Sequence, residues 1–474
     1  MYTFSSRLKT FSFILMIVGV LGIGYSFFTA PKNVEDVEAI LKAEEAHHGG
    51  HHADAAHHDD AAHSDVHAKD DHSAHAAEGH DAHAAHAEPA DANHAHSGHD
   101  AHESEHHKHL EHVLHQLQNK PWAAVYVAAI FFMLISLGAL AFYAIQNAAS
   151  AGWSPVLFRV MEGISAYLIP GAIIVFLLLV AGVMHWHHLF IWMDPEVVAE
   201  DHLIQGKSGY LNGVFFLIRA ALFMGGWIFY RQYSRKNSLA QDEANDNIYY
   251  KKNFKASASF LVFFIVTESI MSWDWIMSVD PHWYSTLFGW YVFASFIVSA
   301  VTVIAMVTLY LKSRGYLEYV NTSHIHDLAK FMFGFSVFWT YLWFSQFMLI
   351  WYADIPEEVT YFVTRIEHYN LPFFGMVAMN FVFPVLILLN TDFKRLSWIV
   401  VIAGIIILCG HYIDFFNMIM PATVGDRWFI GAGEIGAILF FMGLFILVVF
   451  NTLTKAPLLA KRNPLIEESK HFHY

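Results

Sequence analysis

The sequence predicts an all-α polytopic membrane protein with about ten transmembrane helices. Of its 474 residues, 56% are hydrophobic and only 15% are charged, whereas soluble domains carry roughly 25% charged residues. The apolar residues lie in long blocks, many of about 20 residues, which is the length that crosses a bilayer as a helix. A soluble globular enzyme is therefore excluded.

Ten apolar segments are each long enough to cross a bilayer at about 1.5 Å per residue. The first segment has Arg7 and Lys9 ahead of its apolar core, but no clear cleavage site precedes Pro31. We therefore interpret it as a retained anchor and not as a signal peptide. The expected spans are residues 11–29, 122–146, 161–184, 210–232, 257–279, 288–312, 328–352, 371–391, 396–419 and 432–453.

The distribution of basic residues supports ten spans and orients them. If the N-terminus is cytoplasmic, the inner segments hold 18 of the 27 Lys and Arg residues and the outer segments hold 8. Only Arg219 falls inside a span. This asymmetry is what the positive-inside rule requires. We expect both termini on the cytoplasmic side.

The chain is expected to have four parts, one of them low in complexity. Residues 31–120 hold 19 acidic residues against 5 Lys, and 22 of the 33 histidines lie between His47 and His115. So polar a stretch predicts a disordered outer loop. It is interpreted as a solvated tether, a pH buffer or a store for ions such as Zn²⁺, and its spacing defines no specific metal site. The four parts are residues 1–30 (N-terminus and first helix), 31–120 (acidic loop), 121–455 (transmembrane domain) and 456–474 (cytoplasmic tail).

Cysteine and charge counts exclude several cofactors and partners. Cys409 is the single cysteine, so this chain alone holds neither a Cys-ligated iron–sulfur cluster nor a covalently attached c-type haem. Outside the acidic loop the chain is close to neutral, which leaves no basic surface for nucleic acid. We expect no cofactor to be bound by this chain alone.

Ionisable residues within the spans are the first functional candidates, since charge at bilayer depth is costly. Arg219 and Glu268 lie at similar depth in two consecutive spans, so we predict that they face each other. Two interpretations are open: a structural ion pair, or a proton path that includes Glu268. Glu162, near the inner end of its span, is a candidate inner entry point for protons.

A second polar group lies in the ninth span. His411, Asp414 and Asn417 are spaced i, i+3, i+6 and share one helix face. Glu434 enters the last span from the same side, and Asp274 lies in the outer half of the fifth span. The open interpretations are a packed histidine, a proton relay through these residues, or a quinone site whose head group contacts His411, Asp414 or Asp274.

Three spans end on the outer side with aromatic residues and an aspartate near a proline. The residues of this kind are Asp194, Asp280 with His282, and Asp354. Proline ends helices, and Trp and Tyr favour the membrane interface, so a structural belt explains part of the pattern. The repetition also predicts an outer docking face and a weak internal repeat.

Three strings resemble one protein family. They are residues 272–286 (SWDWIMSVDPHWYST), 326–330 (HDLAK) and 345–358 (SQFMLIWYADIPEE). They resemble the F subunit of alternative complex III, which is similar to the NrfD-type membrane subunits of molybdoenzyme relatives. The resemblance covers roughly residues 120–455.

The resemblance implies two four-helix bundles, made by helices 2–5 and 6–9 and flanked by helices 1 and 10. It implies a quinol:cytochrome c oxidoreductase in a bacterial inner membrane, with the acidic loop in the periplasm. Quinol would be the substrate of the complex. Partners would be a paralogous C subunit, an iron–sulfur subunit, c-type cytochrome subunits, lipid and a terminal oxidase.

For this subunit the resemblance implies a structural role and a proton path, because the quinol site is placed in the C subunit. Direct quinone binding by this chain is the alternative. A rival from another class is a divalent-metal transporter with the His-rich loop as collector. That rival requires His or Asp ligands at matched depths on different helices.

Overall fold

The computed structural model describes residues 1–49 and 97–473, and no strand occurs in that part of the chain. Ten helical segments there are long and apolar enough to cross a membrane, which confirms the predicted fold class. Most of the His-rich stretch lies outside the described residues. The ten segments are Ser6–Thr29, Leu110–Ala148, Pro155–Val183, Gly213–Gln241, Ile248–Val279, Phe288–Ser313, Thr322–Ala353, Asn370–Leu388, Ser397–Val424 and Ala432–Leu453.

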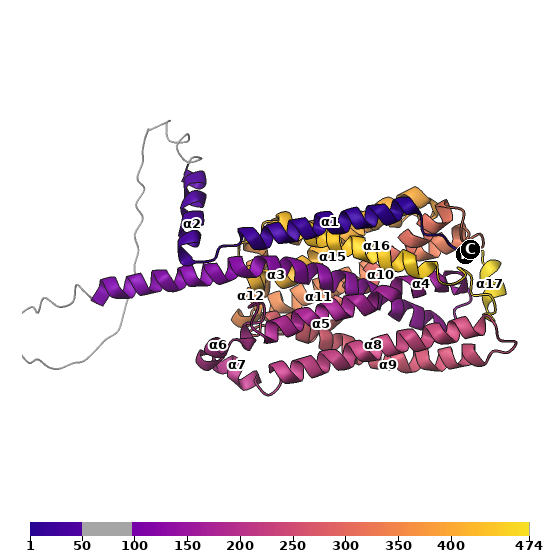
Figure 1. Cartoon of the computed structure of the whole chain (residues 1–474), viewed down its shortest axis with the longest axis horizontal. Coiled ribbons are helices and arrows are strands. Elements are labelled where there is room, and N and C mark those ends of the chain that lie inside the picture. The colour runs from indigo at the N-terminus through magenta and orange to yellow at the C-terminus, as the bar shows by residue number, and fades with distance from the viewer. Residues whose placement is uncertain (50–96, 474) are drawn as a thin grey trace, which may run out of the picture. The chain divides into compact units, whose positions relative to one another are not determined.

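The individual elements follow the chain as Figure 1 labels them. Several spans are interrupted by short 3-10 or π turns, which carry the label η. The α-helices are α1 (Ser6–Thr29), α2 (Val34–Gly49), α3 (Ser97–Ala148), α4 (Phe158–Ile164), α5 (Leu168–Val183), α6 (Pro195–Glu200), α7 (His202–Lys207), α8 (Gly213–Gln241), α9 (Ile248–Trp275), α10 (Phe288–Ser313), α11 (Thr322–Ala353), α12 (Pro356–Glu367), α13 (Asn370–Val377), α14 (Phe383–Leu388), α15 (Ser397–Val424), α16 (Ala432–Leu453) and α17 (Ile466–Lys470). The η turns are η1 (Pro155–Leu157), η2 (Ser165–Tyr167), η3 (Ile191–Met193), η4 (Met277–Val279), η5 (Ala378–Val382) and η6 (Phe393–Arg395).

The chain divides into two compact units. One comprises Met1–Ala30 with Gln116–Tyr474 and holds the transmembrane domain, and the other is Pro31–His115. Helix α3 begins in the smaller unit and continues past Pro121, so this helix starts well before the expected residue 122. A proline inside a helix removes one backbone hydrogen bond, and the long apolar face of α3 that follows compensates by burial.

Helices α3 and α10 form the centre of the transmembrane domain. Their apolar stretches are the most buried of the ten spans, at 94% and 89% of residues. The two helices approach closely at Gly138, where an added Cβ would lie 2.7 Å from the Cβ of Ala300. A glycine is therefore needed at this contact. Polar groups within the apolar stretches of α3 and α10 therefore mostly face protein.

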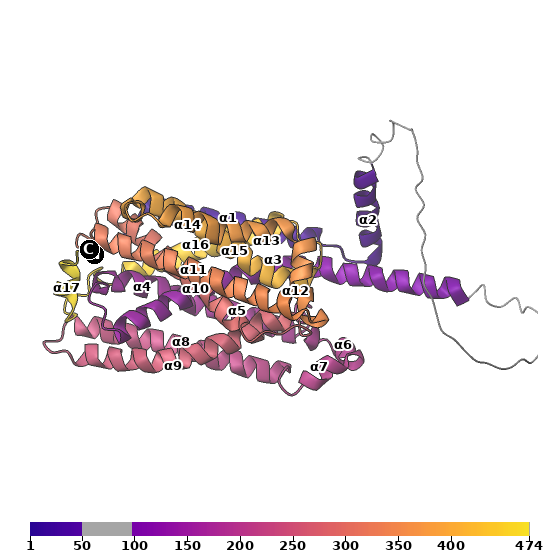
Figure 2. The same cartoon turned by 180° about the vertical axis from the view of Figure 1, so that it is seen from behind.

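The remaining helices pack around this centre as two groups. Helices α5, α8 and α9 pack in succession, and α9 also contacts α10. Helices α11, α13, α14 and α15 pack together beside α10, as Figure 2 shows from behind. Helix α1 runs along α16, where Gly19, Gly22 and Gly436 let the two backbones meet.

The two groups repeat one local pattern when α3 is counted as the first span of one group and α10 as the first span of the other. In each, the second span ends in a segment where Trp, Asp, Pro and Glu follow in that order with other residues between them, and a helix that starts with proline comes next, α6 in one case and α12 in the other. In each group, the hydroxyl of a tyrosine in the first span donates a hydrogen bond to a residue of the fourth span. The Tyr126 hydroxyl donates to the Trp275 carbonyl at 2.8 Å, and the Tyr291 hydroxyl donates to Asp414 Oδ1. The first acceptor is a backbone carbonyl and the second is a carboxylate, so the two contacts share only their place in each group, and the internal repeat stays a prediction.

Candidate functional site

Inner and outer denote the two ends of the spans as the sequence predicts them. At the predicted outer end of the first group, α8 and α9 hold a buried ion pair. Arg219 donates from Nε to Asp274 Oδ2 at 2.6 Å and from Nη2 to Oδ1 at 3.1 Å. Arg219 forms a third hydrogen bond, from Nη1 to the Tyr210 carbonyl at 3.1 Å. The Tyr210 hydroxyl in turn donates to Asp274 Oδ1 at 2.8 Å. The Asp274 side chain is fully buried. Both charges are thus compensated by hydrogen bonds.

The predicted pairing of Arg219 with Glu268 is wrong, because Arg219 pairs with Asp274. Glu268 and Asp274 are six residues apart, or about 9 Å along the helix. Arginine side chains extend toward the nearer membrane surface. Here the Arg219 guanidinium also lies over the Tyr210 and Phe215 rings, 3.9 and 4.3 Å from their centroids. It therefore reaches the outer acid and not the deeper one.

Glu268 is left buried without a cation. The residue has no exposed surface, and Oε1 accepts a bond from the neighbouring Ser269 hydroxyl at 2.8 Å. Within the described chain, Oε2 has no hydrogen-bond partner and no basic side chain lies within ion-pair distance. Next to it, Trp227 Nε1 donates to Thr267 Oγ1 at 3.0 Å. Glu268 is an isolated acid in the middle of a span.

The inner part of the same group holds a larger ionic network around Glu162. Arg159 and Arg235 both donate to Glu162 Oε2, the former at 2.8 Å. Arg159 also donates to Asp242 Oδ2 at 2.6 Å and to the Ser238 carbonyl at 3.2 Å. Two cations thus balance two acids near the inner end of α4 and α8. The predicted inner candidate Glu162 lies in this network.

The second group places its polar residues around Asp414. Asp414 Oδ2 accepts from the Ser295 hydroxyl and from Trp339 Nε1, both at 2.7 Å. Its Oδ1 accepts from Tyr291. His411 Nδ1 lies 3.0 Å from the Ser295 hydroxyl and 3.6 Å from Asp414 Oδ2. Both His411 and Asp414 are completely buried between α10, α11 and α15.

A π turn aims a further polar side chain at His411. Pro384 lacks the N–H that would bond the Asn380 carbonyl in an α-helix, and the backbone there forms the π turn η5. The turn places Asn380 Nδ2 3.4 Å from His411 Nδ1. Gly410 makes room for it, since a Cβ at that position would lie 2.1 Å from Asn380 Oδ1. His411 Nε2 has no partner among the described residues.

Two members of the expected ninth-span group lie apart from His411 and Asp414. Asn417 Nδ2 lies 3.2 Å from Met376 Sδ, while its carbonyl accepts a bond from Arg365 Nε at 3.0 Å. Glu434 Oε2 accepts from the Gly431 amide at 2.8 Å and so caps the start of α16. Within the described residues Glu434 therefore forms no hydrogen bond with the His411–Asp414 pair, and its Oε2 caps its own helix.

The four expected outer residues serve local structure. Asp194 caps α6 by accepting from the Glu196 amide at 3.0 Å, and Asp354 ends α11 with a left-handed backbone at φ 48°. Asp280 and His282 share one loop, where the Asp280 carboxylate accepts from the His282 amide at 3.3 Å. Of these four residues, the structure thus brings together only Asp280 and His282.

That loop is tied to the segment before α7. His282 Nε2 lies 2.5 Å from Asp201 Oδ2, and this hydrogen bond holds the pKa of Asp201 below its usual value. Lys207 Nζ donates to the Pro281 carbonyl at 2.5 Å, and burial lowers the pKa of Lys207. The outer connections of the first group are therefore fixed by polar contacts that we did not predict.

Sequence reasoning missed several residues of these networks. Tyr291 and Ser295 are spaced i, i+4 in their span, and Ser299 continues the same spacing, which is a usable signal for one polar helix face. Trp339 and Asn380 carry no such signal, because tryptophan is common in membrane helices and Asn380 depends on the π turn. The remaining missed residues include Arg159, Arg235, Asp242, Tyr210, Asp201 and Lys207.

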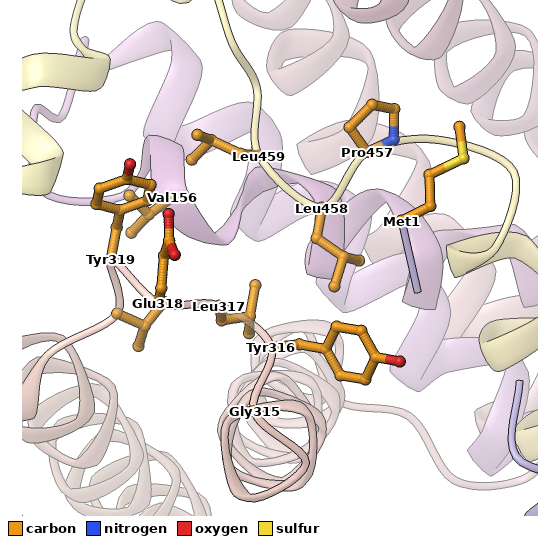
Figure 3. Close-up of a pocket in the computed structure, with 11 residues that line it drawn as sticks. Met1, Val156, Gly315, Tyr316, Leu317, Glu318, Tyr319, Pro457, Leu458 and Leu459 are labelled. Carbon is orange, nitrogen blue, oxygen red and sulfur yellow. The ribbon is translucent and has the colours of Figure 1, made fainter. Parts of the chain in front are cut away.

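Two of the cavities that lie away from these networks exceed 250 Å³. One, of about 510 Å³, lies between α3, α10, α15 and α16 and is lined by apolar side chains with Tyr412 and Glu434. The other, of about 300 Å³, lies where residues 315–320 face residues 457–459 and Met1 (Figure 3). It contains none of the expected site residues, so only the first bears on the predicted chemistry.

Comparison with known proteins adds no assignment, since no family model and no curated protein matches the chain. Among the residues that the structure describes, no group of three or more His, Cys, Asp or Glu side chains is arranged to hold a metal ion. Fold and site together define a multi-pass helical protein with three buried polar networks and one isolated buried acid.

Proposed function

We propose that this chain is the integral subunit of a respiratory quinol:cytochrome c oxidoreductase of the alternative complex III type. It holds the complex in the bacterial inner membrane, conducts protons and carries no redox centre of its own. The three strings within residues 272–358 support the family, and the single cysteine fits a subunit whose haem c and iron–sulfur centres lie in its partners.

Glu268 is the observation that carries the proton-conducting role. A carboxyl at bilayer depth without a cation is costly to ionise. Such a group therefore suits the uptake and release of a proton between neighbouring stations. The Ser269 hydroxyl 2.8 Å away is the one hydrogen-bonding side chain at its carboxyl among the described residues.

The flanking networks supply candidate stations on either side. Glu162 lies with Arg159 and Arg235 toward the inner end, and Asp274 lies with Arg219 toward the outer end. Each carboxylate is paired with at least one arginine, which places a fixed positive charge beside each proposed station. The His411–Asp414 pair provides a second, separate relay in the other helix group.

Direct quinone binding at these acids is less well supported. Both oxygens of Asp274 already accept protein hydrogen bonds, and the same holds for Asp414. A quinone head group needs free donors or acceptors. Three residues were predicted to contact a quinone: His411, Asp414 and Asp274. Among their side-chain nitrogen and oxygen atoms in the described structure, only His411 Nε2 has no hydrogen-bond partner.

The assembly is tested by isolating this chain in mild detergent and recording a reduced-minus-oxidised visible spectrum. Bands of c-type haem with co-purifying subunits are expected, and they must come from partners because the chain has one cysteine. A colourless preparation of this chain alone would contradict the assembly.

The proton role is tested in the intact complex with Glu268→Gln. The amide retains the size of the side chain but carries no transferable proton. We expect normal assembly and quinol oxidation with loss of proton release across liposomes. Exposed Glu357→Gln is the matched control. Unchanged proton release in Glu268→Gln would rule out this path.

A further inference from the structure

The apolar cavity between α3, α10, α15 and α16 has the size of a ligand site. Its volume of about 510 Å³ falls within the roughly 300–1,000 Å³ typical of small-molecule pockets. Along α16 its lining runs from Glu434 to Ile446, which is about 18 Å at the rise of an α-helix. The cavity is therefore a narrow slot parallel to the helices.

The slot opens toward the outside of the transmembrane domain between α15 and α16. Cys409 and Ile430 line it and are both exposed. Ile405 and Ile435, on the same two helices, are also exposed and apolar. At this depth of a membrane-spanning helix, the surroundings are lipid. An occupant enters sideways from the bilayer.

Two polar atoms in the lining have no partner. The Tyr412 hydroxyl and Glu434 Oε1 are buried and form no hydrogen bond within the described residues. Buried polar groups in native proteins are nearly always hydrogen-bonded, because leaving one unpaired is costly. Glu434 Oε2 is fully used as a helix cap, so the free oxygen has no local function.

We propose that this slot binds a lipid-soluble molecule with an elongated apolar chain and a neutral head that carries a carbonyl or hydroxyl oxygen. Tyr412 donates to a carbonyl oxygen of the head, and Glu434 Oε1 accepts from a hydroxyl. No basic side chain lines the slot, which excludes phosphate head groups. The molecule comes from the quinone pool or from neutral monoacyl lipid, and this inference does not depend on the proposed function.

The single cysteine reports occupancy without any engineering. The full chain, purified in mild detergent, is treated with N-ethylmaleimide, and alkylation of Cys409 is followed by mass spectrometry. The probes are decylubiquinone, monoolein and hexadecane. Hexadecane is an alkyl chain without a polar head group. A bound ligand slows labelling by the factor 1 + [L]/Kd, which is about tenfold at ten times Kd.

We expect protection by decylubiquinone or by monoolein, and whichever protects identifies the source. Tyr412→Phe keeps the aromatic ring and removes a hydroxyl that has no partner among the described residues, so we expect the fold to be retained. An unchanged rate of Cys409 labelling in the absence of ligand checks this. It should weaken protection about three- to tenfold, the value of one hydrogen bond.

Tyr167→Phe is the matched control, since its buried hydroxyl is also unpartnered but does not line the slot. The inference is overturned if hexadecane protects as well as the headed molecules, if nothing protects, or if both tyrosine variants behave like the original chain.

Discussion

Replacing Asp274 by Asn tests which acid neutralises Arg219. In the structure Asp274 accepts two charge-assisted bonds from Arg219, at 2.6 and 3.1 Å. Each such bond contributes about 1.5–3 kcal/mol. In the amide, one of the two acceptors becomes a donor that faces the guanidinium, and the buried cation loses its counter-charge. We therefore expect a loss of about 3–5 kcal/mol in the free energy of unfolding.

Glu268→Gln is the matched control in the same helix. Its carboxyl accepts one bond from Ser269 and has no charged partner, so the change should cost only about 1 kcal/mol. The assay is reversible unfolding in mixed detergent micelles, followed by tryptophan fluorescence. The proposed geometry is refuted if Glu268→Gln destabilises the protein as much as Asp274→Asn does, because Arg219 would then depend on the deeper acid.

Two further predictions concern the outer loops and the π turn. The pKa of Asp201 is lowered from 3.8 by His282; the stabilisation is complete above pH 3.8 and lost as the pH falls through the lower value. Hydrogen exchange of residues 196–207 should therefore accelerate below pH 3.8, whereas Asp201→Asn should show no such step, and a step retained in that variant would contradict the link. Gly410→Ala should cost about 1–3 kcal/mol because its Cβ would collide with Asn380 Oδ1. Gly334→Ala, with nothing within 4 Å, should instead stabilise α11 by about 0.5–1 kcal/mol, and equal effects in the two variants would contradict the tight packing at Gly410.

The membrane spans could be predicted because their signal is local. A run of about 20 apolar residues crosses a bilayer whatever its neighbours are. The same logic identified Arg219, Glu268 and His411 as exceptional, since each interrupts such a run. The interruption of the eighth span by η5 was not predicted, as Pro384 alone does not indicate where a helix widens.

The ion-pair partner of each buried charge could not be predicted from the neighbouring sequence. Arg219 has two acids within reach along α9, and the rotation of α9 against α8 and the position of Tyr210 select Asp274. Glu434 likewise turned out to cap its own helix. A helix face can be read from the spacing of its residues, but its rotation toward a neighbouring helix depends on the packing of both.

By itself the sequence determined the class of the protein, the number of its spans and the positions of its intramembrane charges, because burial of apolar surface in lipid depends on composition along one segment. Only the tertiary structure decided that Glu268 lies without a cation, that Asp414 is surrounded by donors from α10 and α11, and that a slot remains beside Tyr412. These features arise where side chains from separate helices meet, and such distances are set by how the helices pack and not by their order in the chain.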